Sequence, residues 1–173
     1  MNKADITTLF DYNYWATGRI LEQSAHITPE QFVTAPNAHT NSLRRTLAHT
    51  LGAERLWRAR WETGTSSITA SADDFPTVEA LRLSWAEEER ALRAYLATLD
   101  DAALMRPVRF ERRGAVVSYT LWHLMMHLVN HGTQHRSEAA ALLTAYGHSP
   151  GDLDFFFFIA PADLPEPPHA IPM

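Results

Sequence analysis

The segment from about Ser118 to Tyr146 constrains the fold most, because it is the longest stretch of the sequence with a helical pattern. Gly147 follows it as a helix stop. Three more long helices are predicted, and they run from about Lys3 to Gln23, from Asn41 or Ser42 to Glu62, and from Thr77 to about Leu99. Four long helices with one long crossover predict an all-α fold of the four-helix bundle type.

Shorter signals fill the segments between these helices. Thr28-Pro-Glu-Gln has the pattern of a helix start and predicts one helical turn in the connection between the first two helices. β-forming residues from Leu104 to Tyr119 predict a short hairpin or an extended loop before the last helix. We expect one domain over residues 1–160, followed by a proline-rich, extended and mobile tail over residues 161–173.

The composition is typical of a soluble globular domain and excludes several kinds of site. The chain has 173 residues, of which 46% are hydrophobic and 20% are charged. It contains no cysteine, which excludes disulfides, thiolate zinc sites, cysteine-ligated iron–sulfur clusters and a cysteine nucleophile. The net charge of −5 argues against nucleic acid as a partner. The start of the sequence lacks a signal-peptide pattern, and the longest apolar run is too short to span a bilayer. We therefore expect a cytoplasmic protein with no membrane partner.

Histidine recurs at every fourth residue of the last helix, at positions 123, 127, 131 and 135. Since a helix turns by about 100° per residue, each step of four residues drifts by only about 40°. His131 and His135 therefore lie on one stripe, one turn apart, which suits two imidazoles on a single metal ion. Leu124 and Leu128 occupy nearly the same stripe, so the pattern predicts that these histidines point into the bundle interior.

A third ligand is needed, because two imidazoles from one helix do not bind a metal ion tightly. His49 is the only histidine of the second helix. It shares an arc with Ala53 and Leu56, whereas Arg44 and Arg55 lie opposite, so it is also predicted to face inward. Three imidazoles would leave one or more coordination positions for water or substrate, which is typical of a catalytic metal site.

Each of these histidines also has a simpler interpretation. A lone inward histidine such as His49 is often a hydrogen-bonded core residue, and the pair His131 and His135 would also suit packed or solvated positions. His127 lies about 40° from the stripe. It is interpreted as a further ligand, as a hydrogen-bond donor to a ligand or as a residue that lines the pocket. His123 lies about 80° from His131 and is not expected to bind the ion.

The sequence contains no other motif for a nucleophile or a phosphate site, since G-x-S-x-G, Walker, G-x-G-x-x-G and H-E-x-x-H patterns are all absent. A catalytic residue is not assigned, and Glu138 on the histidine stripe is the candidate for a supporting role. Glu54 lies about 140° from the histidine of its helix and is expected to be structural or solvated. Tyr14, Trp57 and Trp122 could line a pocket, although aromatic residues at helical spacing are more often core.

Several segments are similar to the DinB/YfiT-like family. They are Tyr14-Trp15-Ala16 in the first helix, Leu47 to Trp57 in the second, Val129 to Arg136 in the fourth and Asp152-Leu-Asp-Phe near the end. The segment in the fourth helix, with its two histidines, is the most specific of these. The resemblance extends from about Asp5 to Ala160.

The resemblance implies an up-down-down-up four-helix bundle with a divalent metal ion, commonly zinc or nickel, held by His49, His131 and His135. It also implies a homodimer. Family members of known activity include enzymes that depend on low-molecular-weight thiols, some of which transfer the thiol to electrophiles.

Two residues near the last histidine depart from patterns of the family and its relatives. Ser137 stands where the related sulfoxide synthases of ergothioneine assembly have a glutamate, so that motif is absent. Glu138 stands where the family often has glutamine. Its carboxylate could orient a ligand imidazole, take a fourth coordination position or pair with Arg136 or another cation.

These observations favour a metal-dependent enzyme that activates a small thiol or water for reaction with a small-molecule substrate, as a thiol transferase or a hydrolase-like enzyme. Zinc or nickel is the expected metal, and iron or manganese would also fit. The alternative is a non-enzymatic metal-binding stress-response protein in which the ion stabilises the fold. Arg109, Arg112 and Arg113 form a basic patch that would suit an anionic thiol better than DNA.

Overall fold

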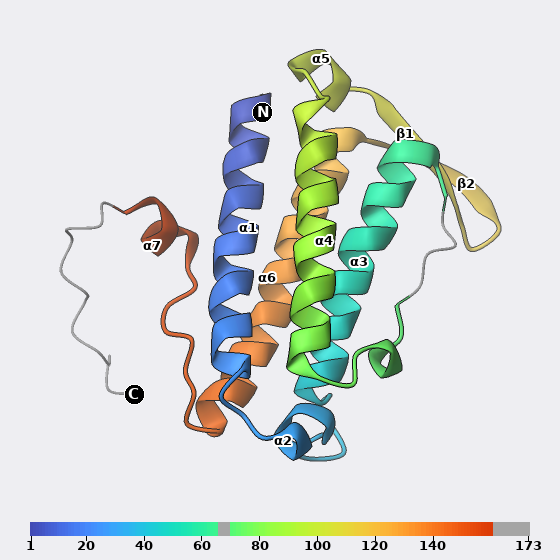
Figure 1. The fold of residues 1–173 in the computed structure, drawn as a ribbon. Helices are drawn as coiled ribbons and strands as arrows, with labels where there is room; N and C mark the ends of the chain where they lie inside the picture. The colour runs from blue at the N-terminus through green and yellow to red at the C-terminus, as the bar shows by residue number, and fades with distance from the viewer. Residues whose placement is uncertain (66–69, 161–173) are drawn as a thin grey trace.

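The computed structural model describes residues 1–65 and 70–160, which form a mostly helical fold with one small sheet. Four long helices lie side by side (Figure 1): α1 (Lys3–Ser24), α3 (Leu43–Thr63), α4 (Val78–Ala97) and α6 (Leu121–Ala145). In Figure 1, α1 and α6 run in one direction, and α3 and α4 run in the other. α6 packs against α1 and α3, and α4 packs against the same two helices. The helical character predicted from the sequence is confirmed.

Shorter helical elements connect or follow these helices. α2 (Pro29–Val33) begins after Thr28, which forms a capping box with Gln31, as the sequence predicts. A 3-10 turn, η1 (Ala72–Asp74), precedes α4. α5 (Asp101–Leu104) is a single turn that the sequence analysis did not predict, because four residues are too few to show a helical period.

Side-chain caps place the ends of the first three long helices close to the predicted positions. The backbone N–H of Asp5 donates to Asn2 Oδ1 over 2.9 Å and so closes a capping box at the start of α1. Ser42 and Thr77 cap α3 and α4 in the same way. α3 ends at Gly64, whose φ of 75° lies in the left-handed region that favours glycine.

The predicted hairpin is present and shifts the start of α6. β1 (Pro107–Arg112) and β2 (Ala115–Thr120) pair as antiparallel strands. The turn residues Arg113 and Gly114 have φ of 53° and 79°, the positive values that tight two-residue turns require. Because residues 118–120 pair with β1, α6 begins only after them, and the start predicted at Ser118 is wrong.

The hydrophobic core lies between the four long helices. Phe10, Trp61 and Trp85 are among its largest fully buried side chains. Phe10 meets Trp61 edge to face, with ring centroids 6.3 Å apart. Burial of one large apolar side chain stabilises the fold by about 1.5–3 kcal/mol, whereas an exposed ion pair contributes about 0–1 kcal/mol, so this core holds the helices together.

α7 (Phe155–Ile159) contains the four consecutive phenylalanines and covers the outer face of α1. Phe155 and Phe158 pack on Tyr12, with ring centroids 5.2 and 5.9 Å away. Phe156 instead points to solvent, with 62% of its surface exposed. Half of the phenylalanine cluster therefore packs on the helices and does not plug the space between them.

No helix within residues 1–65 and 70–160 is long and apolar enough to cross a membrane. The proline-rich tail predicted over residues 161–173 lies outside the described residues, and its mobility stays a prediction.

Candidate metal centre

His49 of α3 meets His131 and His135 of α6 where these two helices pack. One ring nitrogen from each histidine lies within 4.8 Å of the other two. The ring of His49 is centred 5.2 Å from that of His131 and 4.7 Å from that of His135. The rings of His131 and His135 are centred 4.5 Å apart. The structure thus brings together the three histidines identified in the sequence, and this grouping fits a metal-binding role.

A glycine beside the group allows α6 to pack closely on α1. Gly132 is buried, and a Cβ atom there would lie 2.7 Å from Arg136 Nη1 and 2.9 Å from Asn13 Oδ1. Both distances are shorter than real Cβ contacts. A larger residue would therefore displace the buried side chains of Arg136 and Asn13, which hydrogen-bond to each other beside the group.

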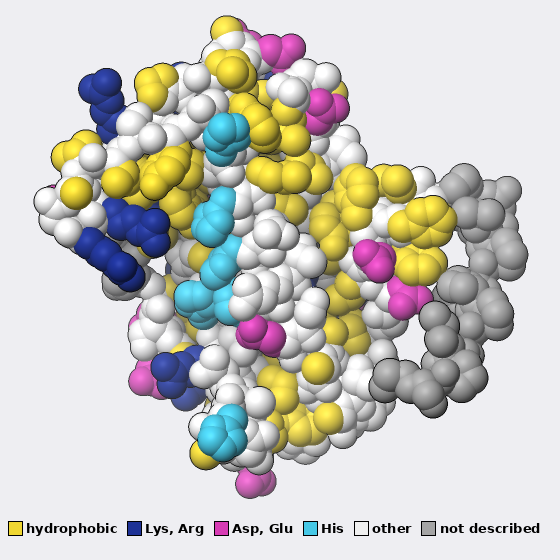
Figure 2. All heavy atoms as spheres, turned by 180° about the vertical axis from the view of Figure 1, so that it is seen from behind, with side chains coloured by type: hydrophobic (Ala, Val, Ile, Leu, Met, Phe, Trp, Pro, Cys, Tyr) yellow, Lys and Arg dark blue, Asp and Glu magenta, His cyan; other side chains and the backbone are white. Residues whose placement is uncertain are grey.

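The group is more exposed than the sequence predicted. His49 is exposed, and His131 and His135 are half-buried, so the expectation that they point into the interior is wrong. The rotation of α6 against its neighbours, which the helical period does not determine, leaves this stripe at the surface. Figure 2 shows histidine side chains in a column on the surface of this face. The group is therefore open to small molecules from solution.

Two of the three rings, those of His49 and His131, favour their neutral form. Burial lowers the pKa of His131 to about 4, and the neighbouring His135 and His49 contribute to this shift. The pKa of His49 is also lowered, by burial first and then by His135. Imidazole binds a metal ion through the lone pair of its neutral form. The group is thus prepared to accept a cation at neutral pH.

Glu138 holds the ring of His135 in place. Its Oε2 atom lies 2.8 Å from Nδ1 of His135, and this contact leaves Nε2 of the ring available to bind an ion. Of the three roles considered for Glu138, orientation of an imidazole fits this contact. Pairing with Arg136 does not, because Arg136 is buried and donates hydrogen bonds to Asn13 and Thr133.

Replacement of Glu138 by alanine is expected to weaken zinc binding by roughly 10- to 100-fold, because the His135 ring loses the acceptor that fixes its orientation and tautomer. Isothermal titration calorimetry of the metal-free protein with zinc measures the change. Ser137→Ala, next to it on the exposed face of α6, serves as the control and keeps the wild-type affinity. Equal affinities of Glu138→Ala and wild type would show that the contact does not support a metal ligand.

A buried polar network lies behind the histidines, and most of it is not evident from the sequence. Glu54 is 1% exposed and accepts hydrogen bonds from Asn13 Nδ2 over 2.9 Å and from Trp85 Nε1 over 3.1 Å. Arg136 donates to Asn13 Oδ1 from the other side. Glu54 therefore has a structural role, which was one of the two alternatives predicted for it. The other alternative, a solvated side chain, is wrong. The sequence signal was Asn13, a polar residue within the apolar stripe of the first helix.

Comparison with known proteins agrees with this arrangement. The model of the family described as DinB family matches residues 1–169 of the chain. The chain belongs to the DinB family. A curated relative, "Protein DinB" of Bacillus subtilis (strain 168), is 24% identical over 157 residues, which cover 87% of this chain and 91% of the relative.

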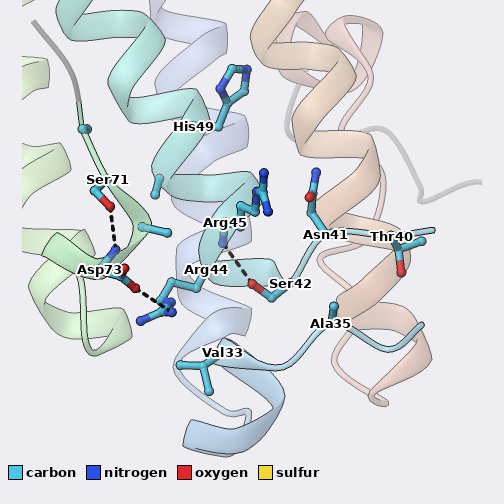
Figure 3. Close-up of a pocket in the computed structure, with 13 residues that line it drawn as sticks. Val33, Ala35, Thr40, Asn41, Ser42, Arg44, Arg45, His49, Ser71 and Asp73 are labelled. Carbon is cyan, nitrogen blue, oxygen red and sulfur yellow. Dashed lines mark hydrogen bonds and ion pairs between the residues drawn. The ribbon is translucent and has the colours of Figure 1, made fainter. Parts of the chain in front are cut away.

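Two cavities flank the histidine group of this DinB-family protein. The larger, about 580 Å³, is mainly polar and has His49 at one end (Figure 3). Arg44 also lines it and pairs with Asp73 over 3.1 Å. The second cavity, about 380 Å³, lies on the other side, and Trp57 and His127 line it. A substrate therefore has space on either side of the DinB-family histidines.

The other candidate residues occupy distinct places in the DinB-family fold. His127 lies outside the three-histidine group and lines the second cavity with Trp57, as one of its interpretations held. His123 also lines that cavity and lies outside the group. Tyr14 is buried, with its hydroxyl 3.4 Å from Glu54 Oε2, and belongs to the core.

Proposed function

We propose that this DinB-family protein binds a divalent metal ion through His49, His131 and His135, and that it is an enzyme that activates a small thiol or water. The proposal is based on one observation, which is that three imidazoles from two helices meet at an open surface. When bound, the ion would lower the pKa of a thiol or water and supply a nucleophile at neutral pH.

The surrounding residues support this assignment. Three protein ligands leave a coordination position open, as in catalytic zinc sites, whereas structural sites are closed by four ligands. Glu138 orients His135, and the cavities beside the group give a substrate access. Imidazole ligands suit zinc and nickel, and iron or manganese is compatible with the same donor set. The directions of the four long helices support the up-down-down-up bundle expected of the family.

Elemental analysis of the purified protein tests the metal site. We expect about one zinc or nickel ion per chain in the wild type and much less in His135→Ala. His39→Ala removes an exposed histidine of the connection before α3 and provides the matched control, with the metal content of the wild type. Equal metal content in all three proteins would contradict the assignment of the ligands.

A turnover screen separates the enzyme from the structural alternative. Metal-loaded protein is incubated with low-molecular-weight thiols and an electrophile such as 1-chloro-2,4-dinitrobenzene, and the thioether product is measured. Product formation that His135→Ala abolishes and His39→Ala retains supports the enzyme. Stabilisation by the metal without product for any thiol supports a stress-response protein in which the ion holds α3 to α6.

A further inference from the structure

The cavity of about 380 Å³ beside the histidine group combines aromatic walls with two arginines. It lies between α3, the β-hairpin and the first turns of α6. Trp57 and Phe110 meet edge to face, with ring centroids 5.5 Å apart, and form its apolar side. Arg60 and Arg112 both line it. Such a cavity has room for a small organic molecule and offers it a flat apolar surface together with positive charge.

The position of Arg60 follows from its contacts with the aromatic side chains. The carbon of its guanidinium lies 4.7 Å from the ring centroid of Trp57 and 4.6 Å from that of Phe110. Cation–π contacts at these distances hold the guanidinium beside the rings. Burial, followed by the charge of Arg112, lowers the pKa of Arg60, so the two cations act on each other within the same space.

The strand register places Arg112, and not Arg109, at this cavity. Arg112 lies two residues after Phe110 in β1, so both occupy the same face of the strand. Arg109 lies on the opposite face and does not line the cavity. Among the described residues that line the cavity, none carries a carboxylate.

His127 connects the cavity to the metal-binding group. Its ring is centred 5.2 Å from that of Trp57 and 5.9 Å from that of His131, against which it stacks. A molecule that lies against Trp57 is therefore next to His127, which in turn stacks on His131 of the group. Figure 2 shows Lys or Arg side chains and hydrophobic side chains next to the histidine column on this face.

We propose that this cavity binds the substrate of the metal centre, and that this substrate is a small planar organic anion. Its anionic group pairs with Arg60 and Arg112, its flat part lies against Trp57 and Phe110, and its reactive end points past His127 to the metal-binding histidines. This inference rests on the proposed function, because it assigns the substrate class of the same site. The cavity on the other side differs in that Asp73, which pairs with Arg44, places a carboxylate in its lining, whereas no described residue that lines the cavity of Arg60 and Arg112 carries one.

Calorimetric titration of the full-length protein with 2-naphthoate tests the cavity, and the neutral 2-naphthylmethanol is the matched probe without charge. The titrations are made both after removal of metal with a chelator and after loading with zinc. In the metal-free protein, we expect 2-naphthoate to bind and Arg112→Gln to weaken its binding by roughly 10-fold or more, because a charge-assisted hydrogen bond is lost. Binding of the alcohol should be weaker and unchanged by the substitution.

Arg109→Gln is the matched control, because it removes the same charge from the opposite face of the same strand and should leave the affinity for 2-naphthoate unchanged. Absence of binding, or equal affinities of Arg112→Gln and wild type, would overturn the cavity assignment. Binding only in the presence of zinc, insensitive to Arg112→Gln, would also overturn it, because the carboxylate would then bind the ion. The zinc affinity of Arg112→Gln is measured separately and tests the metal site independently of the cavity.

Discussion

Zinc is expected to raise the free energy of unfolding by about 4 kcal/mol when its free concentration is about 1,000 times its dissociation constant, and His49→Ala should lose most of this gain. The ligands come from two helices that are brought together only in the folded protein, so the ion binds the folded state in preference to the unfolded chain. His49 is the only ligand from α3. Without it, His131 and His135 leave the ion attached to α6 alone.

Thermal unfolding with excess zinc or with a chelator measures this effect. A stabilisation of 4 kcal/mol corresponds to a rise in Tm of about 8–16 °C for a domain of this size. His39→Ala, an exposed histidine outside the group, should show the full rise and exclude a general effect of histidine loss. The same zinc-dependent rise in His49→Ala as in the wild type would show that α3 supplies no ligand.

The stability of Glu54→Gln relative to wild type is expected to increase by about 2–3 kcal/mol as the pH rises from 5 to 8. Burial raises the pKa of the Glu54 carboxyl from 4.5 to about 7, against the hydrogen bond from Asn13 and the charge of Arg136, which lower it. The folded protein thus holds a proton that the unfolded chain releases above pH 4.5. The stability that this proton provides is complete below that pH and is lost as the pH rises through about 7. Glutamine has nearly the same shape and does not ionise.

The measurement is the free energy of unfolding in urea, for metal-free wild type and Glu54→Gln at several pH values. The relevant quantity is the difference in the free energy of unfolding between the two proteins, because the pH dependence that His131 contributes has the opposite sign. The pKa of its ring is lowered to about 4, so the stability it contributes is lost as the pH falls from 6.5 toward that value. This term cancels in the difference between variant and wild type. Glu87→Gln, which changes an exposed carboxylate of α4, should show no such trend, and a flat difference for Glu54→Gln would exclude a buried acid with a raised pKa.

The helices were predictable because local signals determine where they begin and end. Ser42 and Thr77 are caps that satisfy backbone N–H groups within a few residues, and Gly64 supplies the left-handed residue that closes α3. The histidine group was predictable for a similar reason. The spacing of His131 and His135 fixes their relative position on one helix, and only one histidine was available on the second.

The rest depended on contacts between distant segments. The bond between Arg136 and Asn13 joins residues 123 positions apart, and no local pattern indicates which buried polar groups find each other. The exposure of the histidines depends on how α6 rotates against α3, which the helical period alone does not determine. The separation of Arg112 from Arg109 depended on the strand register, so a basic patch that seemed uniform in the sequence is divided between two faces.

The turn of the hairpin formed by β1 and β2 tolerates changes in sequence better than the four long helices do. The three grouped histidines are carried by helices whose packing is fixed by the core, whereas Arg112 lies directly before a two-residue turn. Insertions or substitutions at such a loop tip cost little stability. Changes at this turn can therefore alter the surroundings of Arg112 while the positions of the three histidines stay the same.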